Sequence, residues 1–274
     1  MLKILNKIFR SDYLNNYDPK DIKEKYIRLS KFYDDESVPF ENCGITKEIQ
    51  MKSKYVPETQ TMMFAWECSR PNRVNKKLPI AIDWVVNLMA WPCLLFSKPE
   101  NIDKTKNFMN GFQTHTGFSI AFLDVIDDIK SDIEKVTKEN KEIKNFEIYG
   151  WSYGGAMAMF THGYLKTLYP NANINTFTIG GPRVVVKLIS NVVTLNRWLS
   201  LKSKYQNLFM FQNANDLITK VPFKFMCYRH IQPGIKLEKP FNIIKIFQPQ
   251  VYHLKTRYDD LIVKYLDKQI EDKK

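Results

Sequence analysis

The stretch IYGWSYGGAMAMF, residues 148–160, decides the fold class of this chain. It places Ser152 between Gly150 and Gly154, after an apolar run that predicts a buried strand and before a segment that predicts a helix. Glycines two residues to either side allow a sharp, strained turn that exposes a nucleophilic hydroxyl above the edge of a sheet. The alternative interpretation is a glycine-rich turn in which Ser152 only caps the helix.

Strand and helix patterns alternate along the rest of the chain. This alternation predicts the α/β class, with a mainly parallel sheet covered by helices on both faces. Residues 1–58 are expected to form an N-terminal helical extension packed on a core domain at 59–274. The expected strands are 61–68, 145–150, 174–181 and 207–213, and the expected helices are 19–35, 118–140, 153–169 and 253–269.

The composition predicts a globular, basic protein. The 274 residues are 44% hydrophobic and carry a formal net charge of +12. Lysines outnumber arginines by 33 to 8, which disfavours nucleic-acid recognition, because that usually depends on arginine. The excess positive charge instead favours solubility or attraction to an anionic membrane surface.

The N-terminal segment 1–10 has an apolar face edged by cations, which would either lie in a membrane interface or pack on the domain as a first helix. It is too short and too interrupted for a signal peptide. The longest apolar run, 78–96, contains Asp83, Asn87 and Pro92, and is therefore a poor transmembrane span. We expect a cytoplasmic protein in peripheral contact with membranes.

Four widely separated cysteines form no C-x-x-C pair, which indicates neither a zinc site nor a disulfide framework. We expect free thiols in a reducing compartment and no metal or organic cofactor. The four are Cys43, Cys68, Cys93 and Cys227.

A nucleophilic serine needs a histidine to remove its proton and a carboxylate to orient that histidine. In this type of fold both partners follow the serine, which leaves His230 and His253 as candidate bases. Asp216 follows an apolar strand in a polar turn and is the candidate acid, although an ordinary turn aspartate is the alternative. The amide of Tyr153, at the start of the following helix, would point toward a developing oxyanion.

From about residue 60 to 268, the chain resembles the class 3 (fungal-type) lipases, a branch of the α/β-hydrolases. The signatures similar to that family's are GWSYGGA at 150–156, GGPRVV at 180–185, DLITKVP at 216–222, YRHIQPGIKLE at 228–238 and YHLKTRY at 252–258. The resemblance implies Ser152 as nucleophile, Asp216 as acid and His253 as base. It puts His230 at the position of a structural histidine.

Upstream, WECS at 66–69 resembles the family's oxyanion strand, and IAIDWVVNL at 80–88 resembles its lid helix. The resemblance therefore implies Ser69 as the second oxyanion donor, beside Tyr153. A buried core helix is the alternative for residues 80–88. The chain departs from the family where Trp151 replaces the usual histidine and where Glu67 and Cys68 replace Arg-Gly; in addition, a polar insertion separates Ser69 from the expected lid.

The resemblance implies a serine lipid-ester hydrolase, either a lipase or a phospholipase-like acyl hydrolase, that works through an acyl-enzyme. Its partner would be a lipid ester, with phospholipid favoured by the positive surface. One alternative is a membrane-binding or partner-binding protein that keeps the lipase fold with weak or no catalysis. Another is an esterase for small soluble esters.

Overall fold

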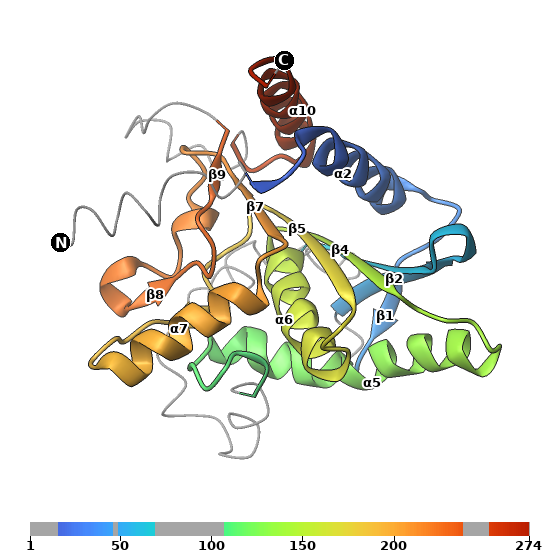
Figure 1. Ribbon diagram of the computed structural model, residues 1–274, viewed down its shortest axis with the longest axis horizontal. Coiled ribbons are helices and arrows are strands. Elements are labelled where there is room, and N and C mark those ends of the chain that lie inside the picture. Colours follow the sequence, from blue (N-terminus) through green and yellow to red (C-terminus); the bar gives the residue numbers. More distant parts are fainter. Residues whose placement is uncertain (1–15, 46–48, 69–106, 238–251, 274) are drawn as a thin grey trace, which may run out of the picture.

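A seven-stranded sheet forms the centre of the computed structural model, which describes residues 16–45, 49–68, 107–237 and 252–273 (Figure 1). The strand order is β1-β2-β3-β4-β5-β7-β9; β3, β4, β5, β7 and β9 run parallel, and β1 and β2 are antiparallel to their neighbours. The mainly parallel sheet confirms the predicted α/β class. The strands are β1 (Glu41–Cys43), β2 (Ile49–Val56), β3 (Thr61–Trp66), β4 (Asn145–Trp151), β5 (Asn173–Ile179), β7 (Leu208–Gln212) and β9 (Ile235–Lys236), with β6 (Val185–Val186) and β8 (Tyr228–Arg229) forming a separate pair.

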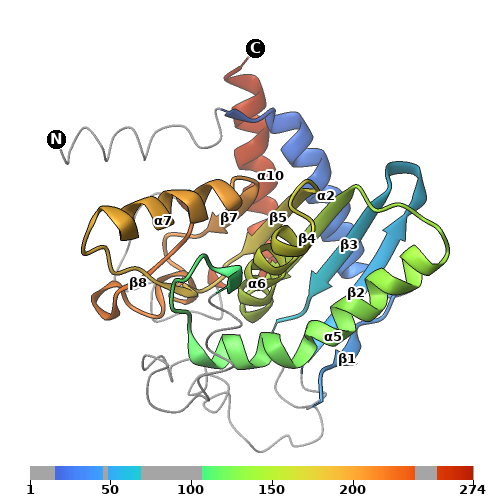
Figure 2. The ribbon, with the colours of Figure 1, turned by 60° about the horizontal axis from the view of Figure 1, so that its bottom comes forward.

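Helices cover both faces of the sheet, as predicted (Figures 1 and 2). On one face α5 and α6 bury side chains against the sheet in a core that includes Phe64, Phe122 and Phe160. On the other face α2 and α10 share a second core with residues such as Tyr149 and Phe177. The helices are α2 (Pro19–Asp34), α5 (Thr116–Lys138), α6 (Tyr153–Leu168), α7 (Val192–Lys204) and α10 (Lys255–Glu271), and the short 3-10 turns are η2 (Pro57–Thr59), η4 (Ile218–Lys220) and η5 (Lys224–Met226).

The structure confirms the four predicted helices and the four predicted strands to within a few residues. It also contains β1 and β2, which the sequence analysis did not predict and which lie inside the segment expected to be helical. Both strands belong to the same sheet as the rest of the chain. The boundary between residues 58 and 59 stays a prediction.

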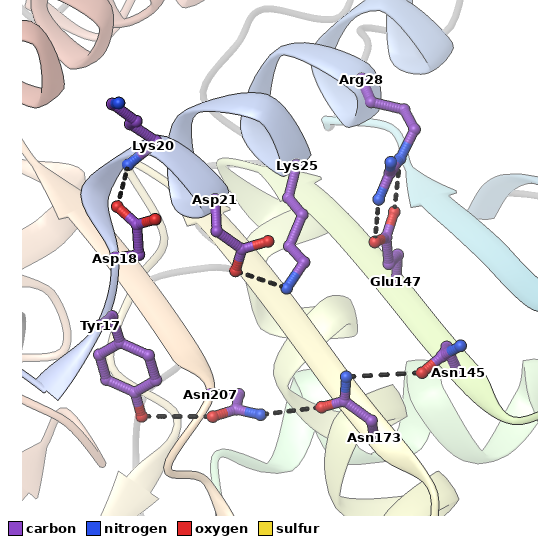
Figure 3. A network of polar contacts seen from close by, with 10 residues as sticks. All are labelled: Tyr17, Asp18, Lys20, Asp21, Lys25, Arg28, Asn145, Glu147, Asn173 and Asn207. Atoms are coloured by element: carbon purple, nitrogen blue, oxygen red, sulfur yellow. Dashed lines mark hydrogen bonds and ion pairs between the residues drawn. The ribbon is translucent and has the colours of Figure 1, made fainter. Parts of the chain in front are cut away.

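Polar side chains link α2 to the sheet and connect the amino-terminal ends of three parallel strands (Figure 3). Arg28 on α2 pairs through two hydrogen bonds with the buried carboxylate of Glu147 on β4. Across the strand ends, hydrogen bonds join Tyr17, Asn207, Asn173 and Asn145 in a row. This network lies at the edge opposite the one where the parallel strands end, so it stabilises the scaffold away from Ser152.

Helices α2 and α10 contact each other extensively although they are distant in sequence. The ammonium group of Lys255 on α10 donates to Asp34 Oδ2 at 2.7 Å and to Ser30 Oγ at 3.0 Å. Tyr26 on α2 donates to Asp259 on α10. The first and last described helices therefore form one unit on their face of the sheet.

Several sequence predictions fall outside the described residues: the segment 1–10, Ser69, the expected lid at 80–88 and Cys93. Within the described ranges, none of the helices is both long enough and apolar enough to cross a bilayer.

Candidate active site

Ser152 occupies a strained turn between β4 and α6. Its backbone has φ 58° and ψ −122°, a conformation that L-residues rarely adopt. The Ser152 N–H donates to the Ile179 carbonyl at the end of β5, 2.9 Å away. Gly150 must be glycine here, because a Cβ at that position would lie 2.1 Å from the Gly154 carbonyl oxygen. The two glycines therefore make the turn that presents Ser152 at the carboxyl edge of the sheet.

The end of β3 lies directly against the start of α6. A Cβ on Gly154 would lie 2.3 Å from the Trp66 carbonyl oxygen and 2.8 Å from that of Glu67. The strand that resembles the family's oxyanion strand therefore runs beside the serine turn, and its last described residue is Cys68. Tyr153, the other predicted oxyanion donor, is the first residue of α6.

Asp216 and His253 lie together at the same edge of the sheet. His253 Nδ1 is 2.7 Å from Asp216 Oδ2, and the Asp216 side chain is fully buried. Within the described part of the chain, His253 Nε2 is buried and makes no hydrogen bond. A neutral imidazole that donates from Nδ1 to a carboxylate leaves Nε2 as a proton acceptor, as a general base requires. His253 precedes α10 by two residues, whereas the sequence predicted it as the first residue of that helix.

Two further donors fix the Asp216 carboxylate. Tyr258, on the first turns of α10, donates its hydroxyl to Asp216 Oδ2 at 2.6 Å and accepts the Asn213 N–H at 2.9 Å. The Ile218 N–H donates to Asp216 Oδ1 at 2.9 Å. The carboxylate is therefore oriented toward His253 by groups on both sides of it. The sequence analysis placed Tyr258 within the helix expected at 253–269 and did not identify this contact.

Arg183, in the GGPRVV motif, holds the loop that carries the acid. Its guanidinium donates to the carbonyls of Lys220 and Pro222, and its N–H donates to the carbonyl of Val221. These bonds connect the segment after β5 to the turn after Asp216. The motif therefore supports the site through a buried arginine.

Gly180 makes room for the candidate acid and the candidate base. It has φ +60°, and a Cβ there would lie 3.0 Å from both Asp216 Oδ2 and His253 Cε1. Its own N–H donates to the Phe211 carbonyl at the end of β7. The close approach of the backbone to both side chains explains a glycine at this position.

Trp151, where the chain departs from the family pattern, contacts the candidate base. Its indole Nε1–H donates to the His253 carbonyl at 3.1 Å, and the two ring centroids are 5.7 Å apart. Trp151 is the residue immediately before the turn at Ser152. One side chain therefore connects the serine turn to the histidine segment.

The other candidate base, His230, has different contacts. His230 Nε2 is 2.8 Å from the Thr219 carbonyl, which requires a proton on Nε2. Burial lowers the pKa of His230 to about 4, so the ring is neutral near pH 7. Of the two candidate bases, the structure places His253 in contact with Asp216, and it places His230 against the backbone of the acid loop.

A model of the family described as Lipase (class 3) matches residues 88–226, slightly more than half of the chain. The comparison with curated proteins gives no match.

Two solved structures illustrate the similarity. Lip2 lipase from Yarrowia lipolytica is 13% identical, with a TM-score of 0.53 over 76% of this chain and 74% of that one. A deletion mutant of the Rhizomucor miehei lipase propeptide complex is 15% identical, with a TM-score of 0.51 over 74% of this chain. The present chain covers only 55% of that protein, in the mutant and the native form alike. At such identities the likeness is one of fold.

The family match covers the segments that carry both Ser152 and Asp216. The mostly parallel sheet and its lipase-fold neighbours agree with that match. The chain therefore belongs to the class 3 lipase family.

Proposed function

We propose that this protein is a serine lipid-ester hydrolase with Ser152 as nucleophile, His253 as base and Asp216 as acid. The observation that carries the proposal is the 2.7 Å contact between His253 Nδ1 and Asp216 Oδ2. That pair lies at the sheet edge where Ser152 stands in its strained turn. Family membership supports the same chemistry.

In the proposed reaction, His253 Nε2 takes the proton of the Ser152 hydroxyl as the oxygen attacks the ester carbonyl. The N–H of Tyr153, at the positive end of α6, and a donor from Ser69 stabilise the oxyanion. His253 then passes the proton to the leaving alcohol, and an acyl group stays on Ser152. A water molecule deprotonated by His253 releases the acid and regenerates the serine.

The substrate we propose is a lipid ester, with a phospholipid favoured over a triacylglycerol. The net charge of +12 would concentrate the protein on surfaces that carry anionic headgroups. Comparing hydrolysis of vesicles and emulsions with hydrolysis of short soluble esters tests this preference. Equal rates on monomeric and aggregated esters would point to an esterase for small substrates.

A fluorophosphonate probe tests the nucleophile directly. We expect an adduct on Ser152, found by peptide mass spectrometry, and no adduct on the folded Ser152→Ala variant. Incubation with a mixed lipid extract should release fatty acids with the wild-type protein only. A folded wild-type protein without adduct or product would contradict the proposal and favour a lipase-fold binding protein.

Alanine substitutions test the roles of the individual side chains. Ser152→Ala, Asp216→Ala and His253→Ala should each lower kcat by at least about a thousandfold, and combined variants should lose little more, because the three groups act as a unit. His230→Ala should have a much smaller effect, since His230 contacts the Thr219 carbonyl. Loss of turnover in folded His230→Ala, with activity kept in His253→Ala, would show that the base assignment is wrong.

A further inference from the structure

We infer that α7, the loop before it and the η5 turn form a docking surface for an anionic lipid bilayer. We call this surface the α7–η5 face. Eight of the twelve large hydrophobic side chains exposed in the described ranges belong to it. They are Leu188, Ile189, Val192, Val193, Leu195, Leu199, Phe223 and Phe225.

The apolar side chains of α7 project into solvent. Val192, Leu195 and Leu199 follow the spacing i, i+3, i+7, which places them on one side of the helix. Leu201, on the far side of the helix, is buried, and so is Trp198, which lies between that side and the exposed row. The helix therefore has two apolar sides, and only one of them is covered by the core. An exposed apolar patch of this kind usually marks an interaction site.

The η5 turn lies next to the start of α7. The Lys187 N–H donates to the Cys227 carbonyl at 2.9 Å, and β6, just before the loop that leads to α7, pairs with β8, just after η5. Phe223 and Phe225 stack at 5.6 Å, and Phe225 is 82% exposed. Both ribbon views place α7 and β8 at the same outer side of the molecule (Figures 1 and 2). The two apolar segments therefore lie beside each other on the same side of the molecule.

The part of the chain that carries this face is strongly basic. Residues 148–237 contain ten lysines and arginines and a single acidic residue, Asp216, which is fully buried. Lys187 lies 4.4 Å above the Trp198 ring at the base of α7. Burial lowers the pKa of Lys187, and the nearby charges of Lys202 and Arg229 lower it further. These cations are therefore close enough to repel one another, and an anionic surface would relieve that repulsion.

An anionic bilayer fits this face better than other occupants do. A symmetric contact with a second copy would bring like charges together. Another part of the same chain would not complement the charge of this face either. Basic residues outnumber acidic residues in each of the segments 1–15, 69–106 and 238–251. Nucleic acid would match the charge, but six of the eight exposed apolar side chains are aliphatic and offer bases no stacking surface; only Phe223 and Phe225 could stack on them. Bilayers accept both features, because cations contact headgroup phosphates while apolar side chains insert between the lipids.

The α7–η5 face is connected to the candidate active site. Arg183, two residues before β6, binds the carbonyls of Lys220 and Pro222, between Asp216 and η5. Docking would therefore hold the acid loop near the membrane surface. That consequence for catalysis rests on the proposed function, whereas the docking itself does not.

Vesicle flotation tests the proposal with the full-length Ser152→Ala protein, which cannot consume the lipid. We expect it to float with phosphatidylcholine vesicles that contain phosphatidylglycerol, and much less with phosphatidylcholine alone. Adding Val192→Ser, Val193→Ser and Phe225→Ser should lower partitioning about tenfold or more. The control, Ile45→Ser, Ile120→Ser and Leu168→Ser, removes three exposed apolar side chains outside this face and should float like the parent.

Further variants distinguish the electrostatic contacts with headgroups from the insertion of apolar side chains. Arg197→Gln with Lys224→Gln should reduce the preference for phosphatidylglycerol by roughly fivefold per charge. Phe225→Ser alone changes only an exposed turn and should weaken flotation without affecting a helix. Equal flotation of the triple variant and its control would overturn the proposal, as would equal binding to both vesicle types. Retention on RNA without flotation would instead assign the face to nucleic acid.

The hydrolysis of a short soluble ester distinguishes the two proposals. With Ser152 restored, the triple variant should hydrolyse that ester at the parental rate. If the parent itself does not hydrolyse esters but still floats, the proposed function fails and the docking surface remains.

Discussion

Trp151 is one of the residues at which this chain departs from the family's pattern, and it contacts the proposed base. Its indole N–H donates to the His253 carbonyl, so it acts on the base through the backbone. Trp151→Phe keeps an aromatic ring beside the imidazole and removes only the donor. We expect kcat for a short ester to fall about threefold to tenfold, in line with the loss of one hydrogen bond, while KM changes little.

Trp198→Phe is the matched control for that variant. It removes the same indole N–H from α7, where the ring packs against Phe112 and Lys187. If both variants lower kcat equally, or if Trp151→Phe acts only by lowering the unfolding temperature, Trp151 has no positioning role.

Residue-level prediction from sequence succeeds where a short motif fixes a residue type at a fixed spacing. Ser152 and Asp216 each have a recognisable local pattern, and the structure places both at the carboxyl edge of the sheet. Trp151 and Tyr258 lie inside such motifs, but their contacts could not be predicted, because an aromatic residue looks the same in a sequence whether or not its polar atom contacts a proposed catalytic residue.

At the scale of elements, the turn after β5 controls how closely the acid and the base approach. A methyl group added at Gly180 would meet both side chains at 3.0 Å, in a backbone conformation that already disfavours alanine. Gly180→Ala should therefore displace the pair and lower kcat about a hundredfold while the protein stays folded.

Gly181→Ala provides the comparison. Its Cβ would have ordinary contacts of 3.5 Å, with Gly155 and Thr178, so kcat for the same ester should be nearly unchanged. A Gly180→Ala variant as active as Gly181→Ala would contradict the inferred close approach.

The elements that the sequence did not predict share a physical cause. β2 contains Lys52, which is buried because its ammonium group donates to the carbonyls of Asp35 and Val38 and lies over Phe32 and Phe40. A lysine at a buried position breaks the alternation of apolar and polar residues by which a strand is recognised in a sequence. In α7, aliphatic residues occupy exposed positions, so the sequence lacks the polar side by which an amphipathic helix is recognised. The longer helices were predicted correctly because most of their apolar residues keep the helical spacing, despite exceptions such as the buried Lys255 and the exposed Ile120.

For the whole molecule, two histidines whose pKa is lowered by burial make stability depend on pH. Burial lowers the pKa of His230 to about 4 and that of His162 to about 3. In the unfolded chain both titrate near their ordinary pKa of about 6.5, so below this pH the unfolded state binds more protons than the folded state. Their stabilising contribution is therefore complete above about pH 6.5 and is lost progressively as the pH falls toward these values.

His230→Gln isolates one of these contributions, because glutamine can donate to the Thr219 carbonyl and does not titrate. The unfolding free energy is measured by urea unfolding at several pH values between 6.5 and 4. In this range it should change with pH less steeply for His230→Gln than for the parent, by up to about 1.4 kcal/mol per pH unit. Parallel curves for parent and variant would mean that His230 is protonated in the folded protein.

The pairing of α2 with α10 has a consequence for how the protein responds to heat. Among the described elements, the most extensive contacts of α10 are with α2, and its first turns carry Tyr258 just after His253. If these two helices loosen together, the hydrogen bonds between strands stay intact but the base leaves the acid. Warming would therefore stop catalysis before it melts the sheet, and the temperature of that first loss would be set by α2, a helix that contains none of the proposed catalytic residues.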